Sequence, residues 1–287
     1  MQNEKTPKDL AAIAYTLRRN VVEMIGVGKA GHLGGSSSLA EVVATLYFRK
    51  MRFNPKAIHD PDRDRFVLSK GHAVLVQYAA LVELGVIPRE ELYKVKTIDG
   101  MLQGHPDMVR TPGIEAVTGS LGQGLSIAVG MALGFKIDRR TSRVYVVMGD
   151  GEQSEGQLWE AAMAAARYKV DNLTGILDRN RVQATGPTKD IFDIPNLEEK
   201  WAAFGWNVIA VDGHDTSALL GAFDAVEQVK GRPSLIIANT VKGKGVSFAE
   251  NSAAFHNGSF TEEQYRKALS EIDEARSALS GSTGGRG

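Results

Sequence analysis

The chain has 287 residues, of which 43% are hydrophobic and 24% charged, and its 34 Lys and Arg residues balance 34 Asp and Glu residues. That balance argues against a nucleic-acid-binding protein, and the absence of cysteine excludes disulfides, thiolate zinc sites and a thiol nucleophile. A charged N-terminus without the apolar core of a signal peptide, and apolar runs too short to span a bilayer, predict a cytoplasmic protein with no membrane association.

The chain begins with a helix signal and continues with strands that alternate with helices. Thr6, Pro7 and Asp9 form the pattern of a capped helix start. The Gly- and Ser-rich segment 26–38 is predicted to be a loop. Apolar runs predict buried strands at residues 65–69, 144–149, 173–178, 206–211 and 234–241, with helices between them, for example at 157–168 and 216–230.

This alternation predicts an α/β fold, in which a doubly wound, mostly parallel sheet carries helices on both faces. No repeat or linker divides the chain, so we expect residues 1–275 to form one domain. The segment 276–287 is small, polar and rich in glycine, and we expect it to be a flexible tail.

Polar and glycine residues follow each predicted strand. The segments after the strands are, in chain order, KGHA, DGE, RNR, DGHD and KGKG. Ligands of open α/β sheets bind at the carboxyl ends of the strands. These segments therefore predict one binding site at that edge of the sheet.

Asp150 lies between Gly149 and Gly151, at the junction of a predicted strand and a predicted helix. An Asp-Gly pair is also common in hairpin turns, but the helical segment that follows favours a site residue. A carboxylate there can bind Mg²⁺ together with substrate phosphates, and the glycines let the backbone approach a phosphate. Asn180 follows the next strand and can complete the site, although an isolated loop asparagine commonly bonds its own backbone.

Two glycine-rich segments resemble nucleotide-binding motifs without matching them. Residues 26–31 fit the spacing G-x-G-x-x-G but follow a helix rather than a strand, which argues against a nicotinamide dehydrogenase. The segment VKGKG lacks the spacing and the Ser or Thr of a phosphate-binding P-loop.

Four of the six histidines lie in polar or Gly-rich segments: His32, His72, His105 and His256. A lone histidine is more often structural, yet imidazole can donate or accept a proton near neutral pH. The segments KAGHLGGSSS, LSKGHA, QGHP, TGSLGQGLSIAVGMA, GDGEQSEGQLWEA, VDGHD and NTVKGKG occur in the order seen in transketolases. The Gly-Asp-Gly of residues 149–151, followed at a distance by Asn180, is also similar to the thiamine diphosphate motif. Residues 10–260 therefore resemble the N-terminal part of the transketolase family.

This resemblance implies binding of thiamine diphosphate and of Mg²⁺, for which Ca²⁺ or Mn²⁺ can substitute. Asp150 and Asn180 would be side-chain ligands of the metal, and Val182 would contribute its backbone carbonyl. The residues expected at the cofactor are His72, Gly119, Ser120, Leu121, Gly151, Glu152 and Asn180. Many single-chain transketolases have proline where this chain has Ser120.

The resemblance also implies a reaction, the transfer of a two-carbon glycolaldehyde unit from a ketose phosphate to an aldose phosphate. The catalytic residues would be His32, His72, His105 and His256, which would face the reactive carbon of the cofactor and the bound sugar. His32 and His256 are the candidates for handling the proton of the donor's C3 hydroxyl.

Two acidic residues, Glu155 and Glu160, follow the Gly-Asp-Gly segment. By the same resemblance they correspond to an acidic cluster at a subunit interface. A solvated helix face is the other interpretation of these two side chains.

Single-chain transketolases continue with two further domains that this sequence does not contain. We therefore expect an N-terminal subunit that acts with a separate C-terminal transketolase subunit, as an α2β2 heterotetramer. The alternatives are a subunit related to deoxyxylulose phosphate synthase or to the α subunit of 2-oxoacid dehydrogenases, and a non-catalytic structural partner that retains the fold.

Overall fold

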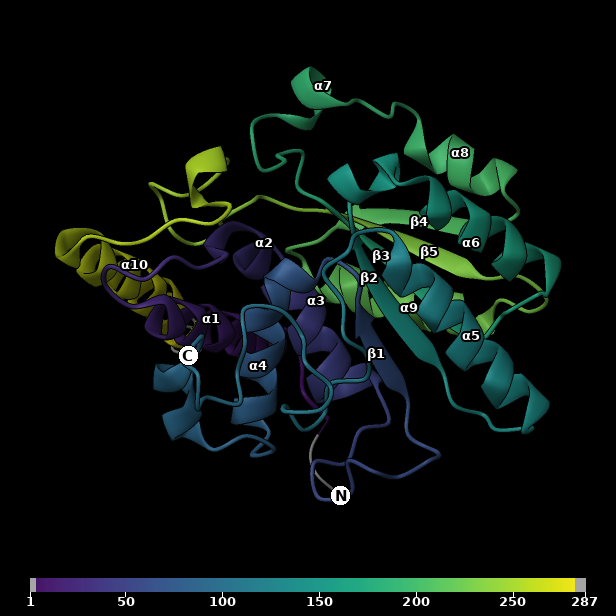
Figure 1. The fold of residues 1–287 in the computed structure, drawn as a ribbon, viewed down its shortest axis with the longest axis horizontal. Helices are drawn as coiled ribbons and strands as arrows, with labels where there is room; N and C mark the ends of the chain where they lie inside the picture. Colours follow the sequence, from purple (N-terminus) through teal and green to yellow (C-terminus); the bar gives the residue numbers. More distant parts are fainter. Residues whose placement is uncertain (1–3, 282–287) are drawn as a thin grey trace, which may run out of the picture.

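The computed structural model describes residues 4–281, and its strands form one sheet in the order β1-β2-β3-β5-β4 (Figure 1). The strands are β1 Arg65–Leu68, β2 Val144–Gly149, β3 Leu173–Arg179, β4 Asn207–Asp212 and β5 Ser234–Asn239. Each lies where the sequence predicts a strand, and all neighbouring pairs are parallel. The predicted doubly wound α/β fold is confirmed.

Helices cover both faces of the sheet (Figure 1). They are α1 Pro7–Ile25, α2 Leu33–Ser38, α3 Ala40–Thr45, α4 Val74–Glu83, α5 Gln123–Ile137, α6 Gly156–Arg167, α7 Thr188–Ile191, α8 Leu197–Ala203, α9 Thr216–Gln228 and α10 Glu262–Gly281. Shorter helical turns span Leu46–Lys50, Gly71–Ala73, Arg89–Lys94, Gly151–Ser154 and Ala253–Phe255.

The sheet separates two apolar cores, because successive side chains of a strand point to opposite faces. In β2, Tyr145 and Val147 pack into the core shared with α1, α3, α4 and α9. Val146 and Met148 pack into the other core, with α5, α6 and α8. Every residue of β2 is buried, as expected for a central parallel strand covered on both sides.

The two long terminal helices pack against each other. The predicted start of α1 is confirmed: the Thr6 hydroxyl accepts from the Asp9 backbone N–H, and the Asp9 carboxylate accepts from Thr6.

Helix α10 continues to Gly281, so residues 276–281 of the segment expected to be a tail are helical. Residues 282–287 lie outside the described residues, and flexibility there stays a prediction. Within residues 4–281, no helix is both long and apolar enough to cross a membrane.

The prediction of a loop over residues 26–38 is wrong for its second half, which forms helix α2. Gly and Ser are poor helix formers, but every residue of α2 is buried. The Ser38 hydroxyl donates to Asp178 over 2.7 Å, and a Cβ added to Gly34 would lie 2.8 Å from Lys242 Cγ. Tertiary packing against β3 and the segment after β5 therefore stabilises a helix that local propensity disfavours.

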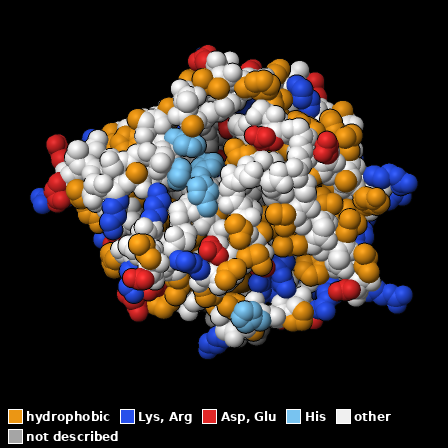
Figure 2. All heavy atoms as spheres, viewed as in Figure 1, with side chains coloured by type: hydrophobic (Ala, Val, Ile, Leu, Met, Phe, Trp, Pro, Cys, Tyr) orange, Lys and Arg blue, Asp and Glu red, His pale blue; other side chains and the backbone are white. Residues whose placement is uncertain are grey.

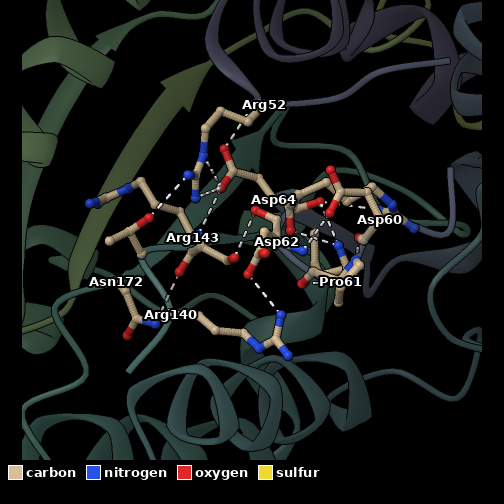
Figure 3. Close-up of polar contacts among 12 residues, drawn as sticks. Arg52, Asp60, Pro61, Asp62, Asp64, Arg140, Arg143 and Asn172 are labelled. Carbon is tan, nitrogen blue, oxygen red and sulfur yellow. Dashed lines mark hydrogen bonds and ion pairs between the residues drawn. The ribbon is translucent and has the colours of Figure 1, made fainter. Parts of the chain in front are cut away.

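A polar network ties together the amino ends of β1, β2 and β3, at the sheet edge away from the predicted site (Figure 3). The buried Asp64 carboxylate accepts the backbone N–H groups of Arg52 and Arg143 over 2.9 and 2.8 Å. The side chain of Asn172 donates to two backbone carbonyls, one of them that of Ser142. These contacts fix how the three strands begin.

The tight packing of α2 can be tested with two glycine substitutions. Gly34→Ala is expected to lower the free energy of unfolding by about 1–3 kcal/mol, because the added methyl crowds Lys242 and the Phe255 carbonyl. The control is Gly221→Ala in α9, where a Cβ would meet nothing within 4 Å, and where alanine is expected to add about 0.5–1 kcal/mol. Urea denaturation measures both. A stabilised Gly34→Ala chain would contradict this account of α2.

Candidate active site

A cavity of about 240 Å³ lies at the carboxyl edge of the sheet, and histidine side chains gather beside a hollow in the surface (Figure 2). The cavity is lined by α2, by the 119–121 loop and by the segments that follow β1, β2, β3 and β5. The predicted site residues among its lining are His72, Leu121, Asp150, Gly151, Glu152, Glu155, Asn180 and Val182. Segments far apart in the sequence therefore meet where the strand-end pattern predicts.

Asp150 and Asn180 come together because β2 and β3 are neighbours, with Gly149 paired to Asp178. The Asp150 carboxylate accepts the backbone N–H of Gly151 over 2.7 Å and that of Arg181. The side-chain oxygen of Asn180 accepts the backbone N–H of Val182 over 3.2 Å. The segment 180–182 is thus folded back onto the end of β2.

The donor groups at this point fit a divalent cation. A carboxylate, a side-chain amide oxygen and the Val182 carbonyl are hard oxygen ligands of the kind Mg²⁺ prefers. The Val182 carbonyl already faces a cationic group, because it accepts from Lys242 Nζ over 2.7 Å. Burial, followed by the nearby charge of Asp178, raises the pKa of Asp150, so a cation at its carboxylate would favour the ionised form. In the described part of the chain, no three His, Cys, Asp or Glu side chains form a group that could hold a metal ion.

Two buried lysines line the cavity, together with the acidic residues Asp150, Glu152 and Glu155. Lys70 and Lys242 are each 2% exposed and both line the cavity. A Cβ added to Gly35 would lie 3.2 Å from Lys70 Nζ and 3.5 Å from His72 Nε2, so the glycine leaves room for a ligand to reach both groups. Cationic groups beside a glycine suit a diphosphate.

The fully buried Asp178 carboxylate holds this edge of the site together. It accepts from Lys70 Nζ over 2.5 Å, from the Ser38 hydroxyl over 2.7 Å, from Asn180 Nδ2 over 3.1 Å and from the Thr240 hydroxyl. Burial opposes ionisation of Asp178, but the charge of Lys70 and these hydrogen bonds hold its pKa below the ordinary value. The carboxylate is therefore ionised and fully paired.

The four predicted catalytic histidines form one cluster. The ring of His32 lies 5.3 Å from that of His72, 5.8 Å from that of His105 and 5.5 Å from that of His256, measured between centroids. The rings of His72 and His256 are 4.8 Å apart. Since His72 also lines the cavity, the cluster borders it directly.

These histidines are uncharged at neutral pH. Burial lowers the pKa of His32 to about 3, with smaller contributions from the neighbouring His256 and from the charge of Lys96. Burial and the charge of Lys242 lower the pKa of His256 to about 4, and the pKa values of His72 and His105 are also lowered, mainly by burial. Neutral imidazole rings can lie close together without repulsion, and each can donate one hydrogen bond and accept another.

The loop of residues 119–121 lies beside the histidine cluster. Gly119 has φ +138, and a Cβ there would lie 2.6 Å from His105 Cδ2, so only glycine lets His105 approach. Ser120 is exposed and Leu121 lines the cavity. The structure thus places this loop at the boundary between the cavity and the histidines.

The three predicted glutamates occupy different environments. Glu152 lines the cavity, but its carboxylate is committed to the Ser69 hydroxyl and to the backbone N–H groups of Gly122 and Gly149. Its contribution to the site is to position loops. Glu155 and Glu160 are exposed at the start of α6, which agrees with an interface or with a solvated face.

Sequence reasoning did not single out two charged residues that shape the site. Lys70 and Lys242 belong to the strand-end segments KGHA and KGKG. Sequence reasoning named Asp178 with Arg179 and Asn180 as a candidate segment, but gave the Asp178 carboxylate no partner. The signal that could have found them is the position of each at the carboxyl end of a buried strand, where a charged side chain needs a partner.

Residues 10–273 match the family model described as "Transketolase, thiamine diphosphate binding domain". The chain belongs to the transketolase family. This confirms its recognition as an N-terminal, diphosphate-binding transketolase subunit.

Relatives of known name cover nearly the whole chain. It is 46% identical over 266 residues to the "6-deoxy-6-sulfo-D-fructose transketolase subunit SqwG" of Clostridium sp. (strain MSTE9). This alignment covers 93% of this chain and 97% of that protein. It is 43% identical over 257 residues to an apulose-4-phosphate transketolase subunit of Phocaeicola vulgatus, over 90% of this chain and 91% of that protein.

Solved transketolases share the fold. The structure superposes on the transketolase from Campylobacter jejuni with a TM-score of 0.86 and 31% identity, over 92% of this chain and 42% of that chain. The transketolase from Leishmania mexicana gives a TM-score of 0.83 and 27% identity, over 98% and 46%. The chain thus spans less than half the length of these solved transketolases.

Pairing of the buried charges predicts the effect of removing one partner. Lys70→Met leaves the Asp178 carboxylate buried without its cation, and is expected to lower the free energy of unfolding by about 3–5 kcal/mol. Adding Asp178→Asn should recover part of this loss. Urea denaturation of both variants near neutral pH measures the difference. Equal stability of Lys70→Met and the natural chain would contradict the pairing.

The neutral histidines predict a pH dependence of stability. Their folded pKa values lie below the ordinary 6.5, so the unfolded chain binds more protons than the folded one as the pH falls through 6.5. The free energy of unfolding should therefore decrease from about pH 8 to about pH 5. His32→Asn should make this decrease shallower. Urea denaturation across this range measures it, and an unchanged slope in His32→Asn would show that folding does not lower the pKa of His32.

Proposed function

We propose that the chain is the N-terminal subunit of a two-component transketolase that uses thiamine diphosphate and Mg²⁺ to transfer a two-carbon glycolaldehyde unit from a ketose phosphate to an aldose phosphate. The observation that carries the proposal is the placement of His32, His72, His105 and His256 beside the cavity that contains Asp150 and Asn180. One side of the site suits a metal-bound diphosphate, and the other suits proton exchange with a sugar.

Three groups would hold the metal: the side chains of Asp150 and Asn180 and the carbonyl of Val182. The diphosphate would lie against Gly151, with the cationic side chain of Lys242 beside it. When bound, thiamine diphosphate supplies a nucleophilic carbon that attacks a ketone and disperses the negative charge released when the adjacent carbon–carbon bond breaks. The protein supplies orientation, charge and proton transfer around that carbon.

The hydrogen bond of His256 supports a role as proton donor. Lys242 Nζ lies 2.9 Å from His256 Nδ1, and an ammonium group can only donate. His256 Nδ1 therefore accepts, and its proton is on Nε2, from which it can donate to a sugar oxygen. His32 is neutral, so one nitrogen of its ring has a free lone pair that can accept the proton of the donor's C3 hydroxyl.

The substrates would be sugars with an anionic terminal group. Relatives of this chain carry names that refer to 6-deoxy-6-sulfo-D-fructose and to apulose 4-phosphate, so the donor need not be a pentose phosphate. Those relatives are also called subunits, which supports a separate partner subunit. We expect the partner to be a C-terminal transketolase subunit and the assembly to be α2β2. The exposed Glu155 and Glu160 would lie at the interface.

Calorimetric titration tests this function most directly. Thiamine diphosphate with Mg²⁺ is titrated into the chain alone and into its mixture with the C-terminal transketolase subunit from the same organism. We expect binding in the mixture that Asp150→Ala abolishes and that a control, His59→Asn at an exposed position before β1, leaves unchanged.

Two outcomes of this titration would contradict the proposal. Absence of binding in both samples would leave a structural partner that retains the fold. Full two-carbon transfer by the chain alone would overturn the two-component arrangement.

A further inference from the structure

The side chain of Lys242 connects the two halves of the site. Its Nζ donates to the carbonyls of Val182 and Gln183 over 2.7 and 3.2 Å and to His256 Nδ1 over 2.9 Å. These contacts use all three protons of the ammonium group. The position of Lys242 therefore sets both the carbonyl offered to the metal and the tautomer of His256.

The backbone around Lys242 is held by contacts outside the sheet ladder, because β5 ends at Asn239. Thr240 N–H donates to the Arg179 carbonyl over 3.2 Å, and Gly243 N–H donates to the Gly34 carbonyl over 3.0 Å. Between them, the Val241 N–H donates to a side chain, the Nε2 atom of His214, over 2.9 Å. His214 is the histidine of the VDGHD segment, to which the proposed chemistry gives no role.

His214 is in turn fixed by a buried ion pair. Its Nδ1 lies 2.9 Å from Glu41 Oε2, and Arg18 donates to both oxygens of Glu41 over 2.7 and 2.6 Å. Burial opposes ionisation of Glu41, but Arg18 and His214 lower its pKa to about 2. Because the ionised carboxylate can only accept, Nδ1 of His214 carries its proton, and Nε2 is free to accept from Val241.

We propose that His214 is a positioning residue of the site: held by Arg18 and Glu41, it fixes the Val241–Lys242 backbone and so places Lys242 between the metal-binding carbonyl and His256. Three elements that do not line the cavity contribute to this chain of contacts, namely α1, α3 and the segment after β4. The inference rests on the proposed function for its consequence, but the contacts themselves are independent of any ligand.

Two substitutions of similar polarity separate the two bonds of His214. The terminal amide of Gln reaches the place of Nε2, so His214→Gln can still accept from the Val241 N–H. The shorter Asn places its amide near Nδ1, so His214→Asn can still donate to Glu41 but loses Val241. If His214 served only to pair with Glu41, His214→Asn would behave more like the natural chain than His214→Gln.

The experiment compares these variants and the control His59→Asn in complex with the C-terminal subunit. Calorimetry measures the affinity for thiamine diphosphate with Mg²⁺, and mass spectrometry measures how fast Lys242 reacts with an amine-specific reagent. We expect His214→Asn to weaken the affinity roughly 10-fold, as for other groups that orient metal ligands, and to speed the labelling of Lys242. His214→Gln should remain close to the natural chain in both measurements.

Two results would overturn the inference. One is affinity and labelling unchanged in both variants; the other is an equal loss in both variants with the same fall in melting temperature, which would show a purely structural residue. If the natural complex binds no thiamine diphosphate, the proposed function fails. The rate at which Lys242 is labelled then tests the positioning role of His214 by itself. Faster labelling of Lys242 in His214→Asn but not in His214→Gln would then support the positioning role of His214. Equal labelling in the two variants would reject it.

Discussion

The geometry of the site depends on one buried carboxylate, that of Asp178. Its hydrogen bonds reach α2 through Ser38, the segment after β1 through Lys70 and the segment after β5 through Thr240. Three segments each carry a cavity-lining side chain two positions after a member of this network: His72 after Lys70, Asn180 after Asp178, and Lys242 after Thr240. Holding Asp178 in place therefore orients one cavity-lining side chain on each of three segments.

Such an arrangement does little for stability in itself. Removing a carboxylate and an ammonium group from water costs several kcal/mol for each ion, and their attraction offsets this only when the remaining hydrogen bonds are also made. The Asp178 carboxylate has these remaining hydrogen bonds, because it accepts from two hydroxyls and an amide in addition to Lys70. The gain is a site whose charged groups are already oriented before a ligand arrives, so that binding does not have to order them.

The sheet was predictable because each strand is a short apolar run closed by polar residues. His32, His72 and His105 stand out because each follows a glycine, whereas His256 follows Phe255 and was named through the family resemblance. Helix α2 was not, because its Gly and Ser residues are helical only through burial against Lys242 and Asp178. The pairing of Lys70 with Asp178 joins residues 108 positions apart, and no local pattern encodes it. The role of Lys242 likewise depends on contacts across several segments.

The polar network around Asp64 gives the two ends of the sheet separate tasks. It anchors the strands at their amino ends, whereas every group that faces the cavity lies at the other end of six-residue β2, about 20 Å away along the strand. Changes in the loops around the cavity leave this anchor untouched. The fold can therefore accept new loop sequences, and with them new ligands, without losing the contacts that align its strands, which makes the scaffold readily evolvable.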